Sequence, residues 1–133
     1  MADIDNVAIA IRNLLVNDNT VKGFVSTRVY NKWRTGTGST YPRVNFGMIS
    51  HTVNENDIHD TLWQFSIFDD DADVNNAQNI SLAVEAVLHW TNFAITGWEC
   101  HWCEKVNSTT VGVDDQRIVH VADDYLIRLR PTA

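Results

Sequence analysis

The stretch that decides the fold is residues 61–90, TLWQFSIFDDDADVNNAQNISLAVEAVLHW, because its hydrophobic period changes from two residues to about 3.6. Trp63, Phe65 and Ile67 alternate with polar residues, as the side chains of a half-buried strand do. Beyond an acidic run, side chains at helical spacing form one stripe, at Ile80, Val84, Val87, Leu88 and Thr91. The stretch therefore predicts a strand, an acidic turn and an amphipathic helix over residues 77–90.

The residues before this stretch predict one helix and two strands. A helical pattern of apolar residues covers Asp3 to Val16, with Asp3 as its N-cap. A turn at Lys22-Gly23 then leads into a short strand over residues 24–30. Residues 33–41, WRTGTGSTY, are rich in Gly, Thr and Ser, which predicts a flexible loop. Residues 42–53 predict the second strand, which begins at a proline.

Two more strands are predicted after the stretch. One begins at Gly97 and carries Trp98, Cys100 and Trp102 on one face, and the last covers residues 117–130. The polar residues between them, 107–116 (NSTTVGVDDQ), predict a flexible hairpin tip or arm. The predicted order is α-β-β-β-α-β-β with hairpin-type connections. That order predicts a single α+β domain, in which two helices pack on one face of an antiparallel or mixed sheet of about four to five strands.

Length and composition fit one soluble domain. The chain has 133 residues, of which 44% are hydrophobic, so it is long enough to bury a core without metals or disulfides. Its apolar runs are too short to span a bilayer, and its acidic N-terminus lacks the basic region of a signal peptide. We therefore expect a protein of the cytoplasm with no membrane partner. Its two cysteines fit that reducing compartment, where thiols stay reduced.

The net charge of −7 comes from 17 acidic and 10 basic residues, with no Lys/Arg cluster. A surface that binds phosphate needs such a cluster, so nucleic acid is not expected as a tight ligand. Two interpretations of the acidity stay open. It serves solubility alone, or it presents a negative surface that repels DNA.

Cys100-His101-Trp102-Cys103 matches the C-x-x-C pattern of redox and zinc proteins. The motif interrupts a strand pattern rather than opening a helix, and residues i and i+3 of a regular strand point to opposite faces. A structural zinc site needs four ligands, and the sequence lacks a second pair. We expect no metal and no cofactor.

The acidic run Asp69, Asp70, Asp71 and Asp73 resembles the start of a calcium-binding loop. Val74 stands where that loop needs glycine, and Ile80 stands where it needs a bidentate glutamate, so the calcium interpretation is not favoured. Carboxylates just before a helix are explained by capping and by the helix dipole.

Catalytic signatures are absent from the sequence. The acidic pair 123–124 near His120, and His59 beside Asp60, are adjacent titratable groups without a nucleophile. We expect that the chain is not an enzyme.

The order of the elements, together with several short motifs, resembles a known family. The motifs are Arg28-Val29-Tyr30, the Y-P-R-V-x-F-G strand at residues 41–47, the strand at residues 63–68, the helix at residues 77–90 and the closing strand through Tyr125. In this order they are similar to the small tail-completion proteins of long-tailed bacteriophages, the tail terminator or tail-to-head joining family. The similarity extends over nearly the whole chain.

This resemblance implies a structural role in the virion tail or neck after assembly in the host cytoplasm. Members of such a family form hexameric rings that cap the tail tube, end its polymerisation and join the tail to the head connector. The implied partners are other copies of the chain, the tail tube protein and the head–tail connector protein. DNA would pass through the lumen of the ring without specific binding.

A ring needs head-to-tail contacts, for which small and polar projecting residues are candidates. The expected contact residues are Trp33, Arg34, Thr35, Gly36, Thr37, Gly38, Asn107, Thr109, Val111 and Asp114. The possible lumen-facing acids are Asp69, Asp70, Asp71 and Asp73, and also Glu55 and Asp57. Two alternatives stay open: a head-side connector or adaptor of the neck, and a small metal-binding or enzymatic α+β domain.

Overall fold

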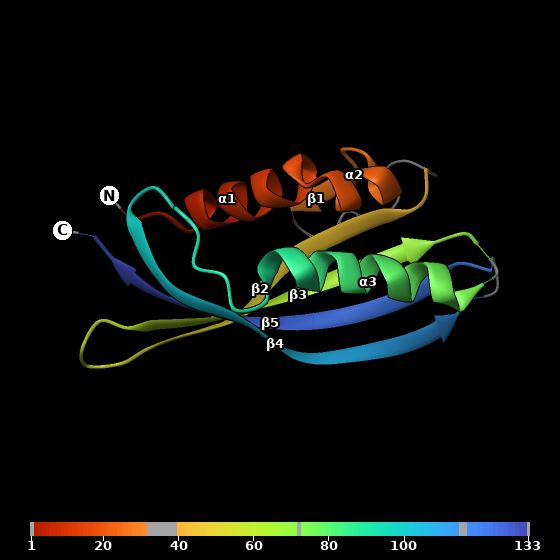
Figure 1. Ribbon diagram of the computed structural model, residues 1–133. Helices are drawn as coiled ribbons and strands as arrows, with labels where there is room; N and C mark the ends of the chain where they lie inside the picture. The colour runs from red at the N-terminus through yellow and green to blue at the C-terminus, as the bar shows by residue number, and fades with distance from the viewer. Residues whose placement is uncertain (1, 32–39, 72, 115–116, 133) are drawn as a thin grey trace.

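The computed structural model describes residues 2–31, 40–71, 73–114 and 117–132, and Figure 1 shows that its helices and sheet form two layers. The elements are α1 (Ile4–Asn17), α2 (Asn19–Val25), β1 (Val29–Asn31), β2 (Arg43–Val53), β3 (His59–Asp69), α3 (Val74–Leu88), β4 (Trp98–Val113) and β5 (Val119–Pro131). The order confirms the predicted α+β class and adds one helix.

The additional helix, α2, corrects the predicted turn and strand start at residues 22–25. Asp18 ends α1 and caps α2, because its side chain accepts a hydrogen bond from the Val21 N–H at 3.0 Å. Val21 and Val25 then lie one turn apart and are both fully buried. A seven-residue helix supplies too few positions for a clear helical period, so the pattern reads equally well as a strand.

The sheet has five strands in the order β1-β2-β3-β5-β4. β1 runs parallel to β2, and the remaining neighbours are antiparallel, so the sheet is mixed. β3 pairs with β5 along its whole length, from His59 beside Leu129 to Asp69 beside Val119. β4 forms one edge, and the three-residue β1 covers only part of β2 at the other edge.

The core lies between the sheet and the helices. Odd-numbered residues of β3 and β5 point toward the helices, and most of them are fully buried. An aromatic cluster fills the centre. Phe46 stacks on Phe65 with 5.4 Å between the ring centroids, and Phe65 packs edge to face with Tyr125 at a centroid distance of 5.1 Å. Each such side chain contributes on the order of 1.5–3 kcal/mol by burial.

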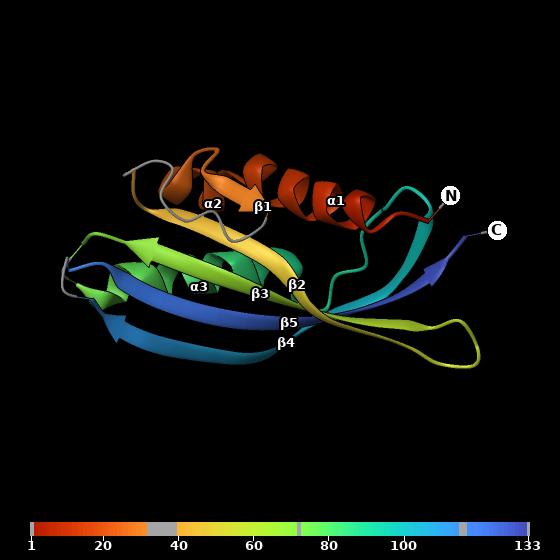
Figure 2. The ribbon, with the colours of Figure 1, turned by 180° about the vertical axis from the view of Figure 1, so that it is seen from behind.

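The opposite face of the sheet carries no helix in the described part of the chain, as Figure 2 shows. Its side chains form polar and aromatic contacts instead. Arg128 donates two hydrogen bonds to Asp60, at 2.7 and 3.0 Å, and its guanidinium lies 4.4 Å from the centre of the Trp102 ring. This pairing lowers the pKa of Asp60 and raises that of Arg128. None of the described helices has the length and apolar character needed to cross a bilayer.

Candidate assembly interface

A buried polar network ties α3 to β4 and β5. Asp123 is fully buried, and the hydroxyls of Ser81 and Ser108 each donate to its carboxylate at 2.5 Å. Lys105 Nζ lies 3.1 Å from Glu85 Oε1 and 3.7 Å from Asp123 Oδ2. The network brings together residues far apart in the sequence, and only Asp123 was a predicted candidate.

The groups of this network satisfy one another. The Ser81 hydroxyl donates to Asp123 while it accepts a hydrogen bond from Lys105 Nζ at 3.1 Å, so both of its hydrogen-bonding roles are taken up within the network. Lys105 lies between the carboxylates of Glu85 and Asp123. Tyr125 is buried beside the network, and burial together with the charge of Asp123 raises its pKa. The arrangement compensates buried charges and fixes the position of α3 on the sheet.

The other titratable pairs named from the sequence are separated by the fold. His59 bonds to Asp57 at 2.9 Å and to the ring of His51 at 2.7 Å, whereas Asp60 faces Arg128 on the other side of the sheet. The ring of His120 stacks on that of Phe68, with 4.5 Å between the ring centroids, and points away from Asp123, because even- and odd-numbered residues of β5 face opposite sides of the sheet. Sequence adjacency therefore does not bring these groups into one site.

The two cysteines lie on the same face of β4, contrary to the prediction. A register shift between Cys100 and Trp102 makes His101 a bulge residue, so Cys100 and Cys103 both face the helices, beside Leu129 and Ile127. Trp102 consequently points to the uncovered face, away from Trp98 and Cys100.

Burial raises the pKa of both thiols, and Cys103 is fully buried. Such thiols are poor nucleophiles and poor ligands. In the described ranges, no three His, Cys, Asp or Glu side chains converge as a metal site requires.

The acidic turn before α3 caps that helix, as the capping interpretation predicted. Asp73 accepts a hydrogen bond from the Asn75 N–H at 3.0 Å, and Asp71 accepts one from the Asp73 N–H at 3.0 Å. Asp69 accepts from the Asn76 side chain at 2.5 Å and is only 1% exposed, so it does not contribute to an acidic surface. Of the predicted lumen-facing aspartates, residues 70, 71 and 73 are exposed.

The predicted contact residues fall into two groups. Trp33, Arg34, Thr35, Gly36, Thr37 and Gly38 lie outside the described residues. Asn107, Thr109 and Val111 are exposed and belong to β4, so residues 107–113 form a paired strand where a flexible arm was predicted. Asp114 is also exposed and follows that strand.

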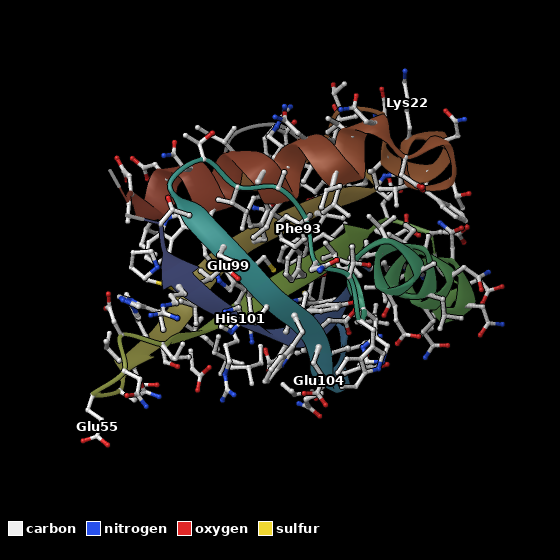
Figure 3. All side chains as sticks on the ribbon, turned by 60° about the vertical axis from the view of Figure 1, so that its left-hand side comes forward. Lys22, Glu55, Phe93, Glu99, His101 and Glu104 are labelled. Carbon is white, nitrogen blue, oxygen red and sulfur yellow. The ribbon has the colours of Figure 1, made fainter. Side chains whose placement is uncertain are left out.

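The first half of β4, residues 98–105, has its outer edge partly covered, and we call it the closed half. The Trp90 N–H donates to the Cys103 carbonyl at 2.6 Å, and the Lys105 N–H donates to His89 Nδ1 at 3.0 Å. The C-terminal end of α3 thus satisfies edge groups that a partner strand would otherwise need to satisfy. Figure 3 shows the side chains of Glu99, His101 and Glu104 along this part of the strand.

The second half of β4, residues 106–113, has an uncovered outer edge, and we call it the open half. In the described part of the chain, no strand lies beyond it. Val106, Val111 and Val113 are 49%, 59% and 52% exposed. Val106 and Val111 are bulge residues, which is how aliphatic side chains come to project from the edge.

A second uncovered edge lies on the opposite side of the sheet. β1 pairs only with residues 44–46 of β2, and no described strand flanks residues 47–53, which we call the free edge of β2. Ile49, again at a bulge, is 45% exposed, and Val53 is 53% exposed. Figure 3 shows Glu55 at the tip of the β2–β3 hairpin, away from the body of the molecule.

A hollow on the helical layer carries few polar side chains among the described residues. A hollow of about 490 Å³ lies between α1 and the C-terminal end of α3, beside Leu14, Val87 and Phe93. Its polar lining is limited to Asn13, Asn17 and Asp18, along with the backbone. A pocket for a small ligand usually has convergent polar groups with perturbed pKa values, and this hollow lacks them in the described residues. The exposed edges are therefore the stronger candidates for function.

Comparison with known proteins gives one informative result. No family model matches the chain, and no curated protein matches its sequence. Among solved structures, a chain described as "Virion of native gene transfer agent (GTA) particle" superposes with a TM-score of 0.80. The alignment covers 96% of this chain and 97% of that one, at 16% sequence identity. The two chains therefore share a fold over nearly their whole lengths.

Proposed function

We propose that this chain is a structural protein of a phage-type virion and that its copies form a ring at the head-proximal end of the tail tube. The observation that carries the proposal is the fold that it shares, over 96% of its length, with a chain of a gene transfer agent virion. The sequence resemblance to tail-completion proteins supports the same role independently.

In this role the ring, a hexamer in our proposal, ends polymerisation of the tube and joins the tail to the head connector. Its partners are further copies of the chain, the tail tube protein and the head–tail connector protein. Both tasks depend on protein–protein interfaces and require no covalent chemistry. The commitment of Ser81, Lys105 and Asp123 to one buried structural network is consistent with this proposal.

The exposed acids have a place in the proposal. Asp70, Asp71 and Asp73 are exposed at one turn, and the chain carries a net charge of −7. If this turn faces the channel of the ring, its carboxylates keep DNA from adhering during passage. Replacing all three by asparagine should then slow DNA ejection while leaving particle yield unchanged.

Electron microscopy of particles from cells that lack the gene tests the proposal. We expect overlong tails, or tails without heads, and rescue by the wild-type gene on a plasmid. Full heads beside unattached tails of normal length would instead indicate a head-side connector. Infectious virions of normal appearance would contradict any structural role.

A further inference from the structure

We infer that copies of this chain associate head to tail by β-strand pairing, with the open half of β4 in one copy beside the free edge of β2 in the next. The inference deepens the proposed function and rests on it in one respect: copies of the chain assemble with one another.

Among the described residues, the two edges lack the features that normally prevent edge-to-edge pairing. Residues 106–113, VNSTTVGV, and residues 47–53, GMISHTV, contain no Lys, Arg, Asp, Glu or Pro. Natural proteins protect exposed edge strands with charges, prolines or covering segments. Here the charged residues of the chain occur elsewhere, and five of the eight exposed large hydrophobic side chains described lie on these two edges: Ile49, Val53, Val106, Val111 and Val113.

Within the described residues, the backbone of the open half presents groups without a strand partner at a regular spacing. Cys103 and Lys105 direct their backbone groups away from β5, toward Trp90 and His89. The register continues past the bulge at Val106, where Asn107 pairs with Asp124 and Ser108 with Asp123. By the alternation of an antiparallel ladder, Ser108 and Thr110 direct their N–H and C=O groups outward.

The free edge of β2 presents a matching pair. The Val44 N–H donates outward, to the Arg28 carbonyl at 3.0 Å. Following the register past the bulge at Ile49 places the outward N–H and C=O groups at His51 and Val53. Each edge thus offers two outward-facing residues that are two positions apart.

The strand directions favour the pairing. β4 runs antiparallel to β5, and β3 runs antiparallel to both β5 and β2, so β4 and β2 run in opposite directions. When the sheet continues from one copy into the next, these edges meet as antiparallel strands. His51 beside Thr110, and Val53 beside Ser108, would then exchange four hydrogen bonds, with Thr52 facing Thr109 between them.

The occupant of each edge is therefore a second copy of this chain, because the complementary edge lies on the chain itself. An interface of this kind is heterologous, so it forms a ring if the rotation between copies closes. The open half of β4 and the β2–β3 hairpin lie toward opposite ends of the sheet in Figure 1, so neighbouring copies are displaced along the strands. A closed sheet accommodates such a displacement by tilting its strands, as β-barrels do.

Single-edge variants test the inference by sedimentation velocity over a range of concentrations. Val111→Lys blocks the β4 edge and Ile49→Lys blocks the β2 edge, and both side chains are exposed, so we expect folding to be preserved. Each variant should weaken self-association at least tenfold. Leu82→Lys, an equally exposed change on α3, serves as the matched control and should associate as the wild type does.

Mixing the two edge variants distinguishes head-to-tail pairing from pairing of identical edges. Each variant keeps one edge that complements the intact edge of the other, so an equimolar mixture should form a one-to-one dimer and stop there. If Ile49→Lys assembles normally while Val111→Lys does not, β4 pairs with β4 and the inference is wrong. A wild type that stays monomeric at millimolar concentration would also overturn it.

A cysteine pair tests the register. With Thr52→Cys and Thr109→Cys in one chain, mild oxidation should yield disulfide-linked multimers, because cross-strand neighbours lie within disulfide distance. Thr52→Cys combined with Glu104→Cys, which lies beyond the open half, should not cross-link. The edge pairing would be refuted if the wild type forms oligomers that the lysine variants do not weaken and that the cysteine pair does not cross-link. That result would leave the ring proposal standing. Particles assembled normally without the gene would refute the proposed function itself.

Discussion

The two halves of β4 have the same partner strand, β5, but they differ in what covers their outer edge. In the closed half, residues 98–105, the end of α3 supplies hydrogen bonds to the edge, and Trp98 and Cys103 are buried. In the open half, residues 106–113, three valines are about half exposed, and no described strand lies beside the outer edge. The difference teaches that one strand can serve folding at one end and assembly at the other.

The largest expected effect on folding comes from the closed half. Trp98 is 6% exposed, its indole N–H donates to the Asp3 carbonyl at 2.9 Å, and its ring meets His59 at 5.1 Å. Trp98→Ala should lower the free energy of unfolding by about 3–5 kcal/mol. Val111→Ala, in the open half, should change it by less than about 0.5 kcal/mol. Equal losses in urea titrations would show that the two halves do not differ in this way.

The buried network provides the next test, because Lys105 joins the closed half of β4 to α3. Asp123→Ala removes the acceptor of both serine hydroxyls and should lower the free energy of unfolding by about 3 kcal/mol. Asp124→Ala, on the uncovered face with a hydrogen bond from Gln64 at 3.3 Å, should cost less than about 1 kcal/mol. Thermal unfolding of both variants checks the comparison. A larger loss for the residue-124 variant would contradict the assignment of the two faces.

A smaller effect is expected at the acidic turn. Asp73→Ala should cost about 1 kcal/mol, because it removes the side-chain acceptor that caps α3. Asp70→Ala, at an exposed neighbour, should leave stability unchanged within about 0.5 kcal/mol. Added calcium should not shift either melting temperature. A calcium-dependent shift would revive the metal interpretation of this turn.

The smallest expected effect on stability comes from His120, which pairs with Gly112 of the open half. Burial lowers its pKa below the ordinary value of 6.5, so protons bind more readily to the unfolded chain. The stability that this group contributes is complete above about pH 6.5 and is lost as the pH falls toward the folded pKa. His120→Phe should flatten the pH dependence of the melting temperature in that window. An unchanged profile would show that His120 does not cause it.

Much of the fold could be predicted from the sequence because its period is regular where the side chains meet the core. Trp63, Phe65 and Ile67 alternate as predicted and are buried, and α3 begins within three residues of the predicted start at residue 77. The short helix α2 was missed because its position depends on the Asp18 cap and on two valines that reach the core.

The face of each residue in β4 could not be predicted, because one bulge residue reverses the alternation. His101 carries no distinct sequence signal, yet it places both cysteines on one face and Trp102 on the other. The uncovered edges are likewise invisible in the sequence, since an edge is defined by the strand order. The uncharged stretches at residues 47–53 and 106–113 acquire a meaning only from the strand order, which places β4 at one edge and the part of β2 beyond β1 at the other.

Amide hydrogen exchange, followed by mass spectrometry at several protein concentrations, tests the central claim most directly. In dilute protein, peptides from residues 98–105 should be protected, whereas those from residues 47–53 and 106–113 should exchange faster. As the protein assembles, we predict that these two segments gain protection together and to a similar extent. Assembly that leaves both segments exchanging as in the monomer, or that protects only one of them, would contradict the account.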